Sequence, residues 1–132
     1  MQNRPTAAEL LEAVRELLAG ELLPTIQDDG LRFRVLIAAN VLAVVERELI
    51  FGDPLRHAEW SRLCELLGAE MLESVADAST PNTVAALNIQ LAATIRAEID
   101  DSARIAPDGD LWQHVRQTLA DQLAVANPKF VL

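Results

Sequence analysis

The chain has 132 residues, the length of a single domain, and Leu and Ala together fill 42 of its positions, which favours helices. Its formal net charge is −9. The acid is spread evenly: residues 1–66 hold 11 acids and 7 bases, giving −4, and residues 67–132 hold 9 and 4, giving −5. Because neither half carries a basic patch, we exclude nucleic acid and an anionic membrane surface as partners.

The cysteine content and the length of the apolar runs indicate the cellular compartment in which we expect the protein. Cys64 is the only cysteine, so the chain forms no internal disulfide and no cysteine metal site. The longest apolar run covers residues 35–45 and is broken only by Asn40. It is shorter than the ~20 residues that a membrane-spanning helix needs. With no signal-peptide pattern at the N-terminus, we expect a soluble cytoplasmic protein.

The first predicted helix begins at a capping box, in which Thr6 is the N-cap and Glu9 stands three residues later. A leucine-rich stripe at helical spacing follows. Pro24 ends this helix because a proline disfavours helical geometry at the residue before it. Residues 28–30, Asp-Asp-Gly, predict a turn.

A second helix is predicted over residues 31–49, and its middle is apolar on all sides. We therefore expect it to be buried, either at the centre of the domain or under another chain. Gly52, Asp53 and Pro54 predict its end and the start of a third helix, with Asp53 as N-cap, Pro54 at the first helical position and Gly68 as C-cap. The inner face of the third helix is expected to hold Trp60, Leu63, Cys64 and Leu67.

Three further helices are predicted in the second half of the chain. A short one covers residues 70–78, and a break at 79–83 caps the next, which ends near residue 100. A last helix covers 110–126. The expected inner faces are Val84, Leu87, Leu91 and Ile95 in the fifth helix and Trp112, Val115, Leu119, Leu123 and Ala126 in the last. The fold class is therefore all-α: one compact domain, a bundle of five or six helices with helix 31–49 central.

Catalytic and metal-binding patterns are weak. Asp53 and His57, like Asp110 and His114, lie four residues apart on one helix face and could each supply two metal ligands. Capping at a helix N-terminus explains both aspartates, and we expect both histidines at the surface. The serines lack a nucleophile-elbow context, Cys64 is interpreted as a core residue, and the glycines form no phosphate loop. We predict no catalytic residue, no metal and no cofactor.

The charges of helix 31–49 suggest an interface. Arg32 and Arg34 stand at its N-terminal end and Glu46 and Glu48 at its C-terminal end, opposite to what the helix dipole prefers. Two antiparallel copies about a two-fold axis would set the arginine end of one beside the glutamate end of the other. These four residues are the predicted partner-binding residues. The alternative is pairing within one chain, or plain solvation.

Asn40 and Arg47 suggest a different site. A buried amide must find a hydrogen-bond partner, and helical spacing puts Asn40 on one face with Arg47, two turns on. The two side chains are the predicted ligand-binding residues, forming a polar stripe that could hold a carboxylate. The alternative is that Asn40 bonds a loop backbone and fixes the register of the helix.

The sequence resembles a small bacterial all-helical family, a domain of unknown function. Three blocks carry the resemblance: Arg4-Pro5-Thr6-Ala7-Ala8-Glu9-Leu10-Leu11; Arg32-Phe33-Arg34-Val35 with Ala38-Ala39-Asn40 and Val45-Glu46-Arg47-Glu48-Leu49; and Ala124-Val125-Ala126-Asn127-Pro128. Residues 69–83 are longer than expected for the family. The resemblance implies a context beside aminoglycoside-phosphotransferase-like kinases and acyl-CoA dehydrogenases, and it carries no catalytic residues.

Two functional hypotheses follow. The first is a non-catalytic accessory or regulatory protein of a phosphotransferase-like kinase or acyl-CoA pathway, a homodimer that acts through protein–protein contacts with a kinase-like or acyl-CoA dehydrogenase partner. The second is a small-molecule-binding bundle or an enzyme with a polar site around Asn40 and Arg47. A polar partner missing from a pocket at Asn40 would favour the second.

Overall fold

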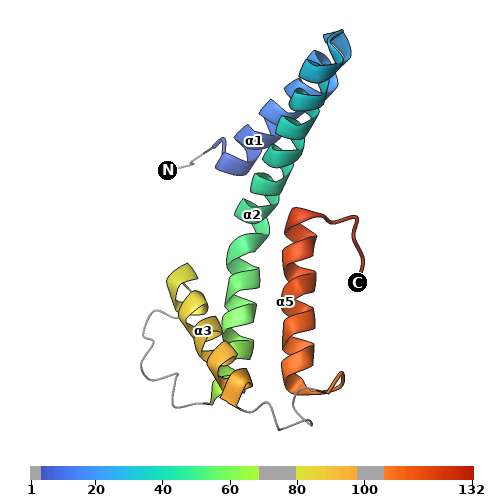
Figure 1. Cartoon of the computed structure of the whole chain (residues 1–132). Helices are drawn as coiled ribbons and strands as arrows, with labels where there is room; N and C mark the ends of the chain where they lie inside the picture. Colours follow the sequence, from blue (N-terminus) through green and yellow to red (C-terminus); the bar gives the residue numbers. More distant parts are fainter. Residues whose placement is uncertain (1–3, 69–79, 98–105) are drawn as a thin grey trace. The chain divides into compact units, whose positions relative to one another are not determined.

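The computed structural model describes residues 4–68, 80–97 and 106–132, and within these residues it is helical with no strand (Figure 1). Its α-helices are α1 (Ala7–Glu16), α2 (Asp29–Leu67), α3 (Pro81–Ala97) and α5 (Asp110–Ala126). The all-α class is confirmed. The described residues form four helices rather than the predicted five or six, and the helix predicted over 70–78 lies outside them.

The N-terminal segment follows its local signals. The Thr6 backbone N–H donates to Glu9 Oε2 at 2.7 Å, and the Glu9 N–H donates to Thr6 Oγ1 at 3.3 Å. These two bonds confirm the predicted capping box. Beyond α1 the chain continues as a π-helical turn (Leu17–Leu22) and a 3₁₀ turn (Leu23–Thr25). The 3₁₀ turn contains Pro24, where the helical segment was predicted to end.

The largest error of the sequence prediction concerns α2. The helix predicted over 31–49 and the third helix, predicted to begin at Pro54, are one helix of 39 residues, with Pro54 inside it. Proline fixes a helix-compatible φ and removes one hydrogen bond, a loss that packing can offset. Asp53 is therefore no N-cap, and its carboxylate pairs with Arg56 instead. Gly68 does end the helix as predicted, with a φ of +97° and its N–H bonded to the Cys64 carbonyl at 3.0 Å.

The described residues divide into two units that are described separately. The N-terminal unit holds the described residues up to Gly52 together with Val125–Asn127, and the C-terminal unit holds the described residues of Asp53–Ala124 and Pro128–Leu132. The core of the C-terminal unit surrounds Leu63, which has no exposed surface. It confirms the predicted apolar face of α3 and the core position of Cys64, and its buried members are Leu63, Cys64, Val84, Leu87, Leu91 and Leu111.

Helix α5 turns a different face inward from the one predicted. About half of the surface of Trp112, Val115 and Leu119 is exposed. The buried positions of the helix are Leu111, His114 and Val125, and Thr118 and Asp121 lie half-buried on the same side. The prediction was wrong because it ranked the two faces by apolar content alone. It could not include the polar partners that α2 supplies to the inward face.

Helix α2 is also less buried than predicted. In its first part, between Asp29 and Gly52, only Ala39 and Gly52 are buried. Phe33 is 61% exposed and Val41 54%. The central, buried position expected for residues 31–49 is therefore not found in the described part of the chain. None of the helices described here has both the length and the apolar content needed to span a membrane.

Candidate functional site

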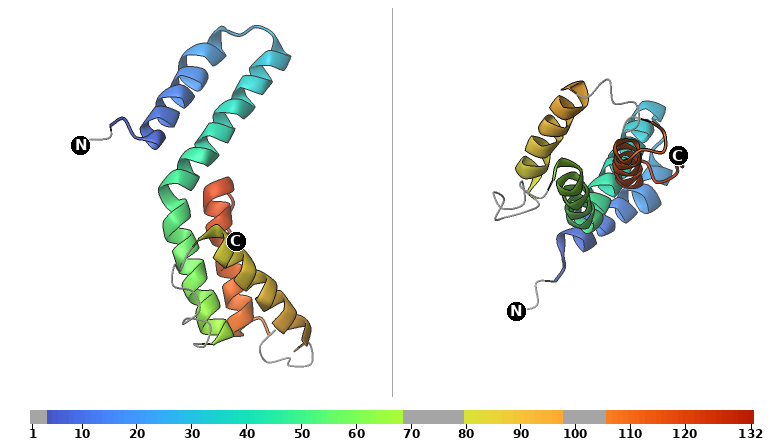
Figure 2. Two further views of the ribbon diagram at one scale, coloured as in Figure 1. Left: turned by 90° about the vertical axis from the view of Figure 1, so that its left-hand side faces the viewer. Right: turned by 90° about the horizontal axis from the view of Figure 1, so that it is seen from below.

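The first candidate site is an exposed surface of the N-terminal unit, where α1 runs beside the first part of α2 (Figure 2). Arg15 of α1 joins Glu46 of α2 in an ion pair, with 3.1 Å between Arg15 Nε and Glu46 Oε2. On another side of α2, Arg47 Nε donates to the Val125 carbonyl at 2.6 Å. These contacts show which sides of α2 are covered within the unit.

Much of this part of α2 is exposed, and we call one of its exposed sides the open face. It combines apolar side chains with one charge near each end: Phe33, Arg34, Ile37, Val41, Val45 and Glu48, all exposed. Leu10, Val14 and Leu17 form a second exposed apolar stripe, on α1 and the π turn after it. Isolated exposed apolar residues are ordinary, but contiguous stripes on two adjacent helices are typical of a protein-contact surface.

The predicted partner-binding residues do not meet in one place within the chain. Glu46 is engaged by Arg15, as the alternative of pairing within one chain proposed. Arg32, Arg34 and Glu48 are exposed, and none has an ion-pair partner among the described residues. Glu46 and Glu48 do not oppose the helix dipole as expected, because α2 continues to Leu67 and both lie in its middle rather than its last turn.

The two predicted ligand-binding residues, Asn40 and Arg47, have different surroundings in the structure. Asn40 is exposed, so its amide needs no protein partner. Arg47 is half-buried, and its Nε is occupied by the Val125 carbonyl. Two surface pockets of about 550 and 420 Å³ lie in the C-terminal unit, and neither Asn40 nor Arg47 lines them.

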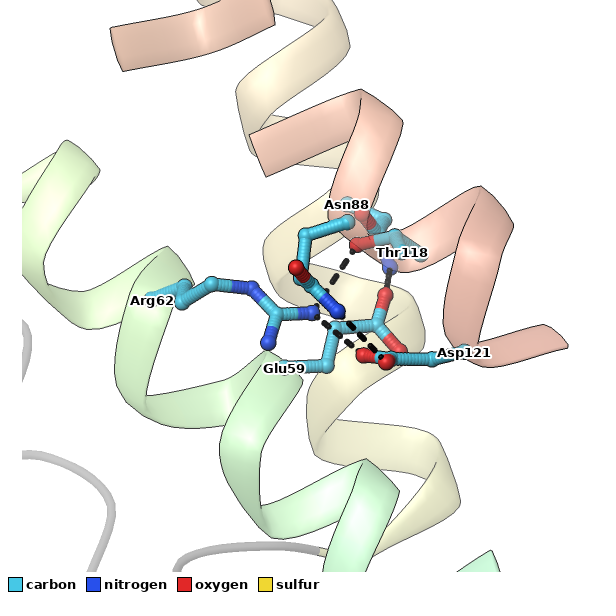
Figure 3. Close-up of polar contacts among 6 residues, drawn as sticks. Glu59, Arg62, Asn88, Thr118 and Asp121 are labelled. Atoms are coloured by element: carbon cyan, nitrogen blue, oxygen red, sulfur yellow. Dashed lines mark hydrogen bonds and ion pairs between the residues drawn. The ribbon is translucent and has the colours of Figure 1, made fainter. Parts of the chain in front are cut away.

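The C-terminal unit contains a polar cluster that the sequence did not predict, formed between α2, α3 and α5 (Figure 3). Arg62 Nη2 donates to Thr118 Oγ1 at 3.2 Å and to Asp121 Oδ2 at 3.1 Å. The side chains of Arg62 and Asp121 are 25% and 16% exposed. Asn88 Nδ2 donates to Glu59 Oε1 at 2.9 Å. The cluster ties α2 to both neighbouring helices.

His114 lies beside this cluster and is 4% exposed, not at the surface as predicted. Burial lowers its pKa, the Arg62 charge lowers it further, and the Glu59 charge opposes them. The imidazole is therefore neutral at pH 7, and its Nδ1 has no hydrogen-bond partner among the residues that the structure describes. Arg62 Nε also has no hydrogen-bond partner within the described part of the chain. The spacing of Leu111, His114, Thr118, Asp121 and Val125 is the one sequence signal that could have found this face.

His114 also lines the 420 Å³ pocket between α2 and α5, with Arg62, Glu65, Leu66, Asp110, Gln113 and Gln117. The pocket sets one arginine against two carboxylates, so it presents no excess of positive charge to an anion. Asp110 Oδ1 accepts the Leu111 N–H at 2.8 Å, at the start of α5. Within residues 4–68, 80–97 and 106–132, no three His, Cys, Asp or Glu side chains gather to hold a metal ion.

The described residues therefore define a helical protein, with a polar cluster among the helices of the C-terminal unit and exposed apolar stripes on the N-terminal unit. The chain belongs to the family described as Domain of unknown function (DUF6285), whose model matches residues 24–130. No curated protein matches the sequence. No solved structure matches it either.

Proposed function

We propose that this protein is a non-catalytic accessory module that acts by binding another protein. The observation that carries the proposal is the exposed apolar surface of the N-terminal unit, on both α1 and α2. Burying one apolar side chain of this size in an interface is favourable by ~1.5–3 kcal/mol, so such a surface is costly to leave in water. The polar cluster at Arg62 is engaged in holding helices together.

For the partner we propose a phosphotransferase-like kinase or an acyl-CoA dehydrogenase. This part of the proposal rests on the gene context that the sequence resemblance implies. The net charge of −9 adds a physical expectation, namely that the partner surface is neutral or basic. A small-molecule site at Asn40 and Arg47 has no comparable support, because the Arg47 side chain already bonds the Val125 carbonyl.

The test is direct binding with purified components. Native mass spectrometry of the tagged protein, gently purified from its own host, identifies a stoichiometric partner, and calorimetry with that purified partner measures the affinity. We expect Leu17→Glu, which puts a charge in the second apolar stripe, formed by Leu10, Val14 and Leu17, to weaken binding by about tenfold or more. Glu12→Gln is the matched control, because Glu12 is also exposed on α1. The proposal would be refuted if neither a phosphotransferase-like kinase nor an acyl-CoA dehydrogenase bound.

A further inference from the structure

The open face of α2 is self-complementary in its charges. Arg34 lies seven residues before Val41, and Glu48 lies seven residues after it. Seven residues are almost two full turns, so all three side chains share one face of the helix. Neither Arg34 nor Glu48 has an ion-pair partner among the described residues, and both are exposed.

We infer that the open face pairs with the open face of a second copy, antiparallel, with Val41 on the two-fold axis. In an interface of this symmetry, residue i of one copy lies level with residue 82 − i of the other. Arg34 then lies level with Glu48 of the second copy, and the pair occurs twice. The pairing rests on the proposed function, since it names the partner of one part of the proposed contact surface.

The apolar residues agree with the same register. Ile37 of one copy lies level with Val45 of the other, and Phe33 with Leu49. All four are exposed in the single chain, as is Val41 at the centre. A parallel pairing would instead set Arg34 against Arg34 and Glu48 against Glu48, which like-charge repulsion disfavours. The charges therefore select the antiparallel arrangement.

The first test reverses these charges in the full chain and measures the monomer–dimer equilibrium by analytical ultracentrifugation. By symmetry, Arg34→Glu introduces two like-charge contacts, and so does Glu48→Arg. We expect each to weaken dimerisation by about tenfold. The double variant restores both pairs with opposite polarity and should dimerise within about threefold of the natural protein. A monomeric natural protein, or a double variant no better than the singles, would overturn the inference.

The second test reads the register by disulfide cross-linking. With Cys64→Ala, the chain has no other cysteine. Val41→Cys should cross-link to itself under mild oxidation, because facing helices ~8–10 Å apart bring central Cα atoms within the ~4.4–6.8 Å reach of a disulfide. Arg34→Cys alone should not cross-link, since its two copies lie about 21 Å apart along the axis. A mixture of Arg34→Cys and Glu48→Cys chains should.

These outcomes separate the two proposals. Cross-linking of Arg34→Cys to itself, or none at Val41→Cys, would refute the antiparallel register while leaving partner binding untouched. A dimer that follows every expectation but binds neither partner class would refute the proposed function and keep the pairing. Circular dichroism on each variant confirms that the exposed substitutions leave the helices intact.

Discussion

Removing the carboxylate charge of Asp121 tests what holds α2 and α5 together in the C-terminal unit. Asp121→Asn keeps the shape of the side chain but removes its negative charge, so that the Arg62 guanidinium keeps only neutral acceptors there, the amide oxygen and the Thr118 hydroxyl at 3.2 Å. Breaking a fully buried ion pair costs ~3–5 kcal/mol. The two side chains here are 25% and 16% exposed, so solvent screening reduces the expected loss to about 1–3 kcal/mol.

The loss is measured as the free energy of unfolding in urea, followed by circular dichroism at one fixed protein concentration. For a chain of this length it corresponds to a fall in Tm of about 3–12 °C. Asp53→Asn is the matched control, because its pair with Arg56 leaves the aspartate 86% exposed, and it should cost less than ~0.5 kcal/mol. If Asp121→Asn and Asp53→Asn destabilise equally, the Arg62–Asp121 pair does not hold the helices together.

Three further changes test other parts of the structure. Leu63→Ala should cost ~2–5 kcal/mol in urea denaturation, because the side chain is fully buried. Burial lowers the pKa of His114, so the unfolded chain binds this proton more readily than the folded one. Stability should therefore fall as the pH drops below ~6.5, and His114→Gln should flatten the slope of Tm against pH. Gly52→Ala should stabilise α2 by ~0.5–1 kcal/mol. The Glu48 carboxylate must move, since a Cβ would lie 2.7 Å from Oε1, so the gain should be larger beside Glu48→Ala.

Local signals were sufficient wherever one pattern had no competitor. The capping box at Thr6, the proline at the end of the first helical segment and the C-cap at Gly68 all depend on neighbours within four residues. The inner face of α3 was predictable because its apolar residues fall on one stripe at helical spacing. Short-range physical chemistry fixes such features whatever the rest of the chain does.

The break expected at residues 52–54 shows where local signals conflict. Asp53 followed by Pro54 is a good start for a helix, but the same proline is also tolerated inside a helix whose flanks are well packed. Leu63 and the helices around it lie well beyond the window in which the pattern is read. The choice between two helices and one therefore depends on tertiary packing, which a sequence pattern does not contain.

The polar cluster on α5 is a second feature that depends on tertiary packing. It carries two stripes, and apolar content alone favours the one with Trp112, Val115 and Leu119, which the structure leaves exposed. The other stripe faces inward because the guanidinium of Arg62, packed among helices, requires hydrogen-bond acceptors, and Thr118 and Asp121 supply them. These two residues lie 56 and 59 positions from Arg62 along the chain, so no local pattern connects them. Once the polar stripe faces inward, the helix must present its apolar stripe outward. The inward position of the polar stripe of α5 and the exposure of its apolar stripe thus have one cause, the need of Arg62 for acceptors. Asp121→Asn tests that cause directly.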